Sequence, residues 1–139
     1  MVGLLVDTCV ISEVRNPRGS QMVRDAFVSL HPSQIHLSVI TIGELRNGAE
    51  LAPNPEFSRA LIDSLSKLEA FHGDRILPID REVAQIWGEI TARARKSGFQ
   101  VAAADGLIAA TALRHGLAVM TRNVRDFEPT GVRLVNPWE

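Results

Sequence analysis

The stretch VAAADGLIAATALRHGLAVMT, residues 101–121, decides the fold class, because a helical pattern leads directly into a strand pattern. The residues that share the inward face at three- and four-residue spacing are Ala102, Asp105, Ile108, Ala109 and Ala112. The run LAVMT at 117–121 then predicts a buried strand. Asp105 is the exception on this apolar face, since an inward carboxylate is costly unless something pairs with it.

Strand and helix patterns alternate through the rest of the chain. Further strand-like segments are GLLVD (3–7), IHLSVIT (35–41), RILPID (75–80) and VRLVNPWE (132–139), the last closing the sheet or packing on its edge. Ser20, Thr41 and Asp80 are predicted to cap the helices that follow them. This order predicts an α/β three-layer sandwich with a mainly parallel sheet flanked by helices, in a single domain over residues 1–139.

Two of the predicted helices carry an apolar stripe that should face the core. The first stripe comprises Met22, Val23, Ala26, Phe27 and Leu30, and the second Phe57, Leu61, Leu65 and Leu68. His72 and His115 precede glycines at helix ends, where a cation would favour the helix dipole. We therefore interpret these histidines as structural.

The composition limits the classes of function. The 139 residues are 45% apolar, enough for a core, and no apolar run approaches the ~20 residues that span a bilayer. The N-terminal run lacks a basic leader and meets an acid at Asp7, so we interpret it as a strand rather than a signal peptide. The single cysteine, Cys9, fits a reducing cytoplasm and a packing role. The net charge of −1 argues against holding nucleic acid by bulk electrostatics, but allows a local grip on phosphate through a metal.

Polar residues far apart in the sequence should meet at one edge of this sheet. Ligands bind beyond the carboxyl ends of parallel strands, where Asp7 and Asn123 follow their strands. Glu44 lies in the first turn of the helix after the second strand, and Asp105 opens the helix that leads into the strand at 117–121. Three acids at one place repel each other unless a cation lies among them. Oxygen ligands of this kind suit Mg²⁺ or Mn²⁺, and the four histidines show no zinc-type spacing.

Each acid also has a structural interpretation. Asp7 could cap the helix that follows it, Glu44 could complete a capping box with Thr41, and Asp105 could be the N-cap of its own helix. Capping gives no reason for all three to lie at strand-to-helix junctions on one edge. Asp105 also has no Arg or Lys within a helical turn. Their joint placement therefore favours a metal site.

Four segments resemble the PIN-domain ribonucleases, and in particular the VapC toxins and their FitB-like members. These segments are LLVDTCVISE, LSVITIGELRNG, AAADGLIAATALRHGLAVMTRNVRDF and the closing NPW, and the resemblance runs from Val2 to Trp138. It implies a PIN-like fold and a Mg²⁺-dependent endoribonuclease, with Mn²⁺ as a possible substitute. The family's catalytic, metal-binding acids fall on Asp7, Glu44 and Asp105. Its fourth catalytic position, often Asp, falls on Asn123.

Residues next to these positions in the sequence are candidates for the outer part of the site. Thr121 is a candidate to bond a metal-bound water, and Arg122 is a candidate phosphate contact or a solvated rim residue. Asp126 could partly replace the missing fourth acid or lie in a surface turn. Cys9 stands where the family commonly has Asn or Ser, which leaves any role for that position open.

The family implies protein partners as well. These are a second copy of the chain and a small VapB/FitA-like antitoxin, in a heterotetramer or larger assembly that contacts DNA only through the antitoxin. Such antitoxins insert an Arg-bearing or aromatic segment into the acidic cleft. The apolar residues of the helix at 56–71 could form that groove or could face the core.

Two other functions remain open from the sequence. The first is a catalytically weak PIN domain that acts as an antitoxin-binding co-repressor, which the Asn at position 123 keeps possible. The second is an acid-cluster phosphatase or receiver-type module. VDTCV contains no Asp-x-Asp, however, and both lysines, Lys67 and Lys96, lie inside predicted helices.

Overall fold

The five strands form one parallel sheet in this computed structural model, which describes residues 3–139. They are β1 (Leu4–Val6), β2 (Ile35–Ser38), β3 (Ile76–Leu77), β4 (Ala118–Met120) and β5 (Leu134–Val135). The order is β3-β2-β1-β4-β5, and every neighbouring pair is parallel. The prediction of a mainly parallel sheet is confirmed. Met1 and Val2, where the predicted domain and the resemblance begin, lie outside the described residues.

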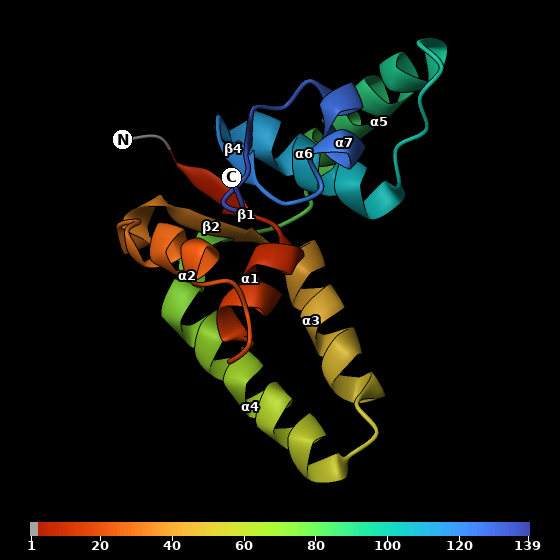
Figure 1. Cartoon of the computed structure of the whole chain (residues 1–139). Coiled ribbons are helices and arrows are strands. Elements are labelled where there is room, and N and C mark those ends of the chain that lie inside the picture. The colour runs from red at the N-terminus through yellow and green to blue at the C-terminus, as the bar shows by residue number, and fades with distance from the viewer. Residues whose placement is uncertain (1–2) are drawn as a thin grey trace.

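Helices cover both faces of the sheet (Figure 1). They are α1 (Thr8–Arg15), α2 (Gln21–Val28), α3 (Val39–Leu51), α4 (Pro55–His72), α5 (Arg81–Lys96), α6 (Ala103–His115) and α7 (Val124–Phe127). Single 3₁₀ turns are η1 (Pro32–Gln34), η2 (Gly73–Arg75) and η3 (Glu128–Thr130). The helices α1–α4 lie on one face and α5–α7 on the other, which confirms the three-layer sandwich. Within residues 3–139, no helix is long and apolar enough to cross a membrane.

The central strand β1 divides the core into two halves. Leu5 packs in the cluster formed with α5 and α6, whereas Leu4 and Val6 pack in the cluster formed with α1, α2 and β2. This division follows from the two-residue side-chain period of a strand. It also explains why the strand Leu4–Val6 is apolar without interruption, since both faces of a central parallel strand are buried. The carboxyl edge of the sheet therefore lies between the two helical layers.

Two of the three predicted caps are confirmed, and the third is wrong. Ser20 Oγ accepts the Val23 backbone N–H, and Asp80 Oδ1 accepts that of Val83. The strand before α3, however, ends at Ser38, whose hydroxyl accepts the Ile40 N–H at 3.0 Å. Ser38 offers a cap three residues earlier than Thr41, so the β-branched run that suggested more strand becomes the first turn of α3. Glu44 therefore does not form the predicted capping box with Thr41.

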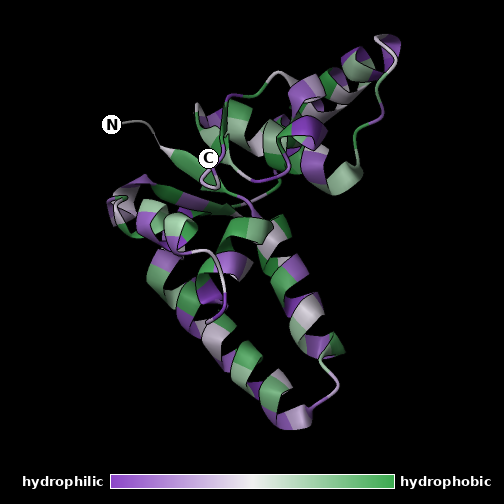
Figure 2. Cartoon of the chain, viewed as in Figure 1, coloured by the Kyte–Doolittle hydropathy of each residue, from purple (hydrophilic) through white to green (hydrophobic). Residues whose placement is uncertain are grey.

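The predicted burial of the two apolar stripes is confirmed for part of each stripe and is wrong for one residue at the start of each. Val23 and Leu65 are buried, but Met22 is 56% exposed and Phe57 is 58% exposed. Phe57 lies in the first turn of α4, at the far end of the α3–α4 pair that extends away from the sheet (Figure 1). Figure 2 shows hydrophobic and hydrophilic bands alternating along α4, as expected for an amphipathic helix with only part of its length over the core.

The expected stabilisation of the helix dipole by a protonated His72 is also wrong. His72 ends α4 but is buried, and burial, together with the nearby Arg75 charge, lowers the pKa of its imidazole. The ring is therefore neutral at neutral pH and cannot act as a dipole-stabilising cation.

Candidate active site

Asp7 is a buried, hydrogen-bonded residue of the carboxyl edge. It follows β1 directly, is only 5% exposed, and donates its backbone N–H to Met120 O at the end of β4. Its Oδ1 accepts the Thr8 N–H at 2.9 Å, so Asp7 does cap α1. Its Oδ2 accepts the Thr121 hydroxyl at 2.8 Å. The carboxylate is thus both a helix cap and a fixed acceptor at the junction of β1 and β4.

Thr121 joins Asp7 to the turn that carries Asn123. Its hydroxyl donates to Asp7 and accepts the Asn123 backbone N–H at 2.9 Å. Thr121 is completely buried, whereas the Asn123 side chain is exposed. The structure therefore places the Thr121 hydroxyl on the Asp7 carboxylate and leaves the Asn123 amide at the surface.

Thr8 links Asp7 to Glu44. The first residue of α1, Thr8, donates its hydroxyl to Glu44 Oε1 at 2.7 Å and lies 3.0 Å from the buried Thr41 hydroxyl. The Glu44 side chain is exposed in the second turn of α3. Thr8 was not among the site residues predicted from the sequence, although a hydroxyl residue immediately after a strand-end acid is a visible signal.

Asp105 lies in the first turn of α6 but does not cap it. Ala102 occupies the N-cap position without a side-chain hydrogen bond, which excludes Asp105 as the N-cap. The pKa of Asp105 is raised to about 6, first by burial and then by the negative charges of Asp7, Asp126 and Glu44. Four carboxylates therefore lie within electrostatic reach of one another. In residues 3–139 no hydrogen bond or ion pair reaches the Asp105 carboxylate.

Gly106 allows α5 to pack closely beside Asp105. A Cβ added to Gly106 would lie 2.9 Å from Trp87 Nε1, a separation that forces a shift in the structure. The indole of Trp87 in α5 therefore rests directly on the turn of α6 that carries Asp105. Glycine at this position is a packing requirement next to the site.

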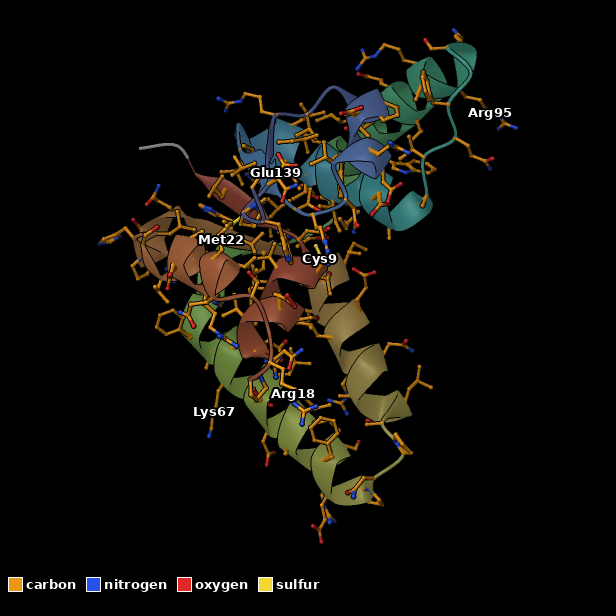
Figure 3. All side chains as sticks on the ribbon, in the orientation of Figure 1. Cys9, Arg18, Met22, Lys67, Arg95 and Glu139 are labelled. Atoms are coloured by element: carbon orange, nitrogen blue, oxygen red, sulfur yellow. The ribbon has the colours of Figure 1, made fainter. Side chains whose placement is uncertain are left out.

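Cys9 has more contacts in the site than a simple packing role requires. Its Sγ lies 3.5 Å from Asp7 Oδ2 and 3.6 Å from Thr121 Oγ1, and it also receives the Arg122 backbone N–H. Burial, with a smaller effect of Asp7, raises the pKa of the thiol, so it remains protonated at neutral pH. Figure 3 shows Cys9 at the start of α1, where the two helical layers meet.

Arg122 and Asp126 lie at the rim. Both side chains are exposed, and the Arg122 guanidinium carbon lies 5.2 Å from the centroid of the Trp138 ring. Asp126 lies in α7 and acts on Asp105 through its charge. The rim thus adds the Arg122 cation and a fourth acid, Asp126, to the three acids of the edge.

The donor set fits a hard divalent cation in its chemistry. Asp7, Glu44 and Asp105 offer only oxygen, and a cation among them would relieve the repulsion that raises the Asp105 pKa. Within residues 3–139, no three His, Cys, Asp or Glu side chains are grouped closely enough to hold a metal ion. The acids thus lie near enough to interact electrostatically, but they are not arranged as a complete metal coordination sphere.

A cavity of about 420 Å³ opens beside Glu44. It lies between α1, α3 and α4, and its lining includes Thr8, Arg15, Glu44, Phe57 and Leu61. Because Thr8 and Glu44 belong to both, the cavity continues the acidic edge as an apolar groove with one cation on its wall.

Residues 4–131 match the PIN-domain family, and the chain belongs to that family. It is 42% identical over 137 residues to Toxin FitB of Neisseria gonorrhoeae, covering 97% of this chain and 98% of that protein. It is 37% identical over 141 residues to the VapC ribonuclease Y4jK of Sinorhizobium fredii, covering 98% of each.

Solved structures give the same result. The crystal structure of FitAcB from Neisseria gonorrhoeae matches with a TM-score of 0.94 at 39% identity, over 98% of this chain and 99% of that chain. A structure of FitAB bound to an IR36 DNA fragment matches with a TM-score of 0.93 at 37% identity, over 98% and 96%. The predicted resemblance and the PIN-like fold are confirmed.

Proposed function

We propose that this chain is a metal-dependent endoribonuclease that acts in the cytoplasm as the toxin of a type II toxin–antitoxin pair. The observation that carries the proposal is the gathering of Asp7, Glu44 and Asp105 at one sheet edge, where burial and then the neighbouring acids raise the pKa of Asp105 to about 6. Relatives that match nearly the whole chain are named a toxin and a ribonuclease. Membership of the PIN-domain family is the reason to set aside the phosphatase and receiver alternatives.

Asp7 and Asp105 would hold the cation, which we propose is Mg²⁺ with Mn²⁺ as a substitute. When bound, such an ion lowers the pKa of water and polarises a phosphoryl oxygen. Asp7 contributes a carboxylate already oriented by Thr8 and Thr121. Asp105 contributes one that has no side-chain partner among residues 3–139 and would exchange its proton for the cation.

Glu44 is the residue we assign to the attacking water. Its Oε1 accepts from Thr8, which fixes the carboxylate and leaves Oε2 to accept a proton from water. Water attacks phosphorus in line, the bond to the 3′ oxygen breaks, and the proton passes to that oxygen. The products are a 5′-phosphate and a 3′-hydroxyl end. Asn123 would donate its exposed side-chain amide to the substrate in place of the family's fourth carboxylate.

The decisive experiment compares cleavage of a labelled structured RNA by the purified chain in Mg²⁺, in Mn²⁺ and in EDTA. We expect cleavage with either ion, none in EDTA, and none with Asp105→Asn in any condition. Asp63→Asn, which removes an exposed acid of α4 away from the edge, is the matched control and should cut at the wild-type rate. Wild-type rates from Asp105→Asn would contradict the assignment.

The same assay tests the weaker alternative. Because position 123 is Asn rather than Asp, the chain could be a PIN domain that mainly binds its antitoxin and represses its own operon. In that case the wild type would show no Mg²⁺-dependent cleavage while still binding the antitoxin. Cleavage that depends on Asp105 would exclude this function.

We propose a second copy of the chain and a small antitoxin of the VapB/FitA type as protein partners, in a heterotetramer or larger assembly that reaches DNA through the antitoxin. The groove beside Glu44 suits an antitoxin segment, because it joins apolar walls from Phe57 and Leu61 to the acidic edge. The FitAB complex bound to DNA is a similar structure that supports this arrangement.

A further inference from the structure

The C-terminal NPW turn, residues 136–138, packs against the acidic edge, although the mechanism above gives it no task. Trp138 packs on the core cluster that contains β1 and α1, and its backbone N–H donates to Asn136 Oδ1 at 2.9 Å. The strand before this turn is tied to β4, since Thr121 N donates to Val135 O at 2.9 Å. Figure 1 accordingly shows the C-terminus over the sheet near β1 and β4.

The backbone at Arg122 is fixed on both sides. The Thr121 hydroxyl bonds Asp7 and also the backbone N–H of Asn123, and the Arg122 N–H itself reaches Cys9 Sγ. The backbone around Arg122 is therefore linked to the Asp7 carboxylate through the Thr121 hydroxyl.

The Arg122 guanidinium rests on an aromatic ring instead of on an acid. Its carbon is 5.2 Å from the Trp138 ring centroid, within the range of a cation–π contact. The ion pairs in residues 3–139 join Arg46 to Glu50 and Arg114 to Glu82, so no carboxylate in that range neutralises Arg122. The ring thus contacts the exposed Arg122 cation at the rim of an edge rich in acids.

We propose that Trp138 is a positioning residue that holds Arg122 as a phosphate-binding residue for the RNA backbone. The inference rests on the proposed nuclease function. It adds a cationic contact beside an edge whose proposed catalytic side chains are acidic or neutral. A planar guanidinium stacked on a ring keeps its in-plane donors free for two phosphate oxygens. Arg122 binds the RNA backbone, and Trp138 acts only through Arg122.

The test is a double-mutant cycle on Arg122→Ala and Trp138→Leu, with Trp138→Phe as the conservative variant and Arg125→Ala as the matched control. Arg125 is an exposed cation of α7 that contacts no ring in the described residues. The readouts are KM and kcat for a fluorogenic single-stranded RNA in Mg²⁺, and Kd for a labelled RNA in EDTA at several salt concentrations.

We expect Arg122→Ala to raise KM and Kd about tenfold with little change in kcat, and to reduce the salt slope of log Kd by about 0.7, as for one lost phosphate contact on a single strand. Trp138→Leu should give a smaller loss that disappears in the Arg122→Ala background, and Trp138→Phe should restore most of it. Arg125→Ala should leave the slope unchanged.

Additive losses in the double variant, or a Trp138→Leu protein with an unchanged salt slope, would mean that Trp138 is only a structural contact and would overturn the proposal. The binding arm separates this outcome from failure of the proposed function. A wild type that cuts no RNA but shows the coupled Kd values refutes the nuclease and supports the phosphate contact. RNA cleavage without energetic coupling between Arg122 and Trp138 supports the nuclease and refutes the positioning role of Trp138.

Discussion

Asp7 and Asp105 are carboxylates at the same sheet edge, but their surroundings differ. Asp7 is buried and accepts hydrogen bonds from Thr8 and Thr121. Asp105 is half-buried, has no such partner among residues 3–139, and its pKa is raised to about 6 by burial and by neighbouring acids. The β1–β4 half of the site is therefore organised by the chain itself. The α6 half is electrostatically unfavourable until a cation arrives.

The largest expected difference is in the sign of a stability change. In EDTA at pH 7, Asp105→Asn should stabilise the fold by on the order of 1 kcal/mol, because it removes a charge that burial and the neighbouring acids disfavour. Asp7→Asn should destabilise it by about 1–2 kcal/mol, because an amide cannot accept both hydrogen bonds. Both variants should lose about a thousandfold or more in RNA cleavage. Urea unfolding of the two variants measures the sign of each change in unfolding free energy. Two changes of the same sign would contradict the difference proposed between Asp7 and Asp105.

The second prediction concerns a substitution that disrupts the β1–β4 half of the site without removing a charge. Thr121→Val removes the donor to Asp7 and the acceptor of the Asn123 N–H. The loss should be about 1–3 kcal/mol in unfolding free energy and about 10- to 100-fold in activity. Thr121→Ser keeps the hydroxyl and should recover most of both. If Val and Ser behave alike, the hydroxyl does not orient Asp7.

The third prediction uses pH. A carboxyl pKa that rises from about 4 in the unfolded chain to about 6 in the fold means that the folded state binds more protons between these values. This contribution to stability is complete below pH 4 and is lost as the pH rises through 6. In EDTA, the stability advantage of Asp105→Asn over wild type should therefore appear between pH 4 and 6 and then level off. A constant difference from pH 4 to 8 would contradict the raised pKa.

The smallest effect is expected at Thr8. Thr8→Val removes the hydroxyl that holds Glu44 Oε1 at the exposed side of the site. We expect a stability change below about 1 kcal/mol and a fall in kcat of about tenfold with KM nearly constant, because Glu44 loses its orientation. Steady-state kinetics on the same RNA substrate checks the split. A change confined to KM would place Thr8 in substrate binding instead.

The sequence predicted which acids lie at the carboxyl edge better than it predicted the side-chain contacts between them and their neighbours. Strand-end positions and helical spacing were sufficient to bring Asp7, Glu44 and Asp105 to one edge, because parallel topology makes these positions converge. They were not sufficient for the start of α3, because Ser38 and Thr41 are both residue types that cap helices and the structure uses Ser38. Links between side chains, such as Thr8 with Glu44 or Arg122 with Trp138, depend on rotamers and loop paths that no local pattern encodes.

Calorimetric titration of Mn²⁺ into the purified chain near pH 6, in two buffers of different ionisation enthalpy, tests most directly whether these carboxylates share a divalent ion. We predict that wild type binds Mn²⁺ and releases on the order of half a proton per ion as Asp105 ionises, and that Asp105→Asn binds far more weakly and releases none. Equal binding by both proteins, or no binding by wild type, would contradict the metal site.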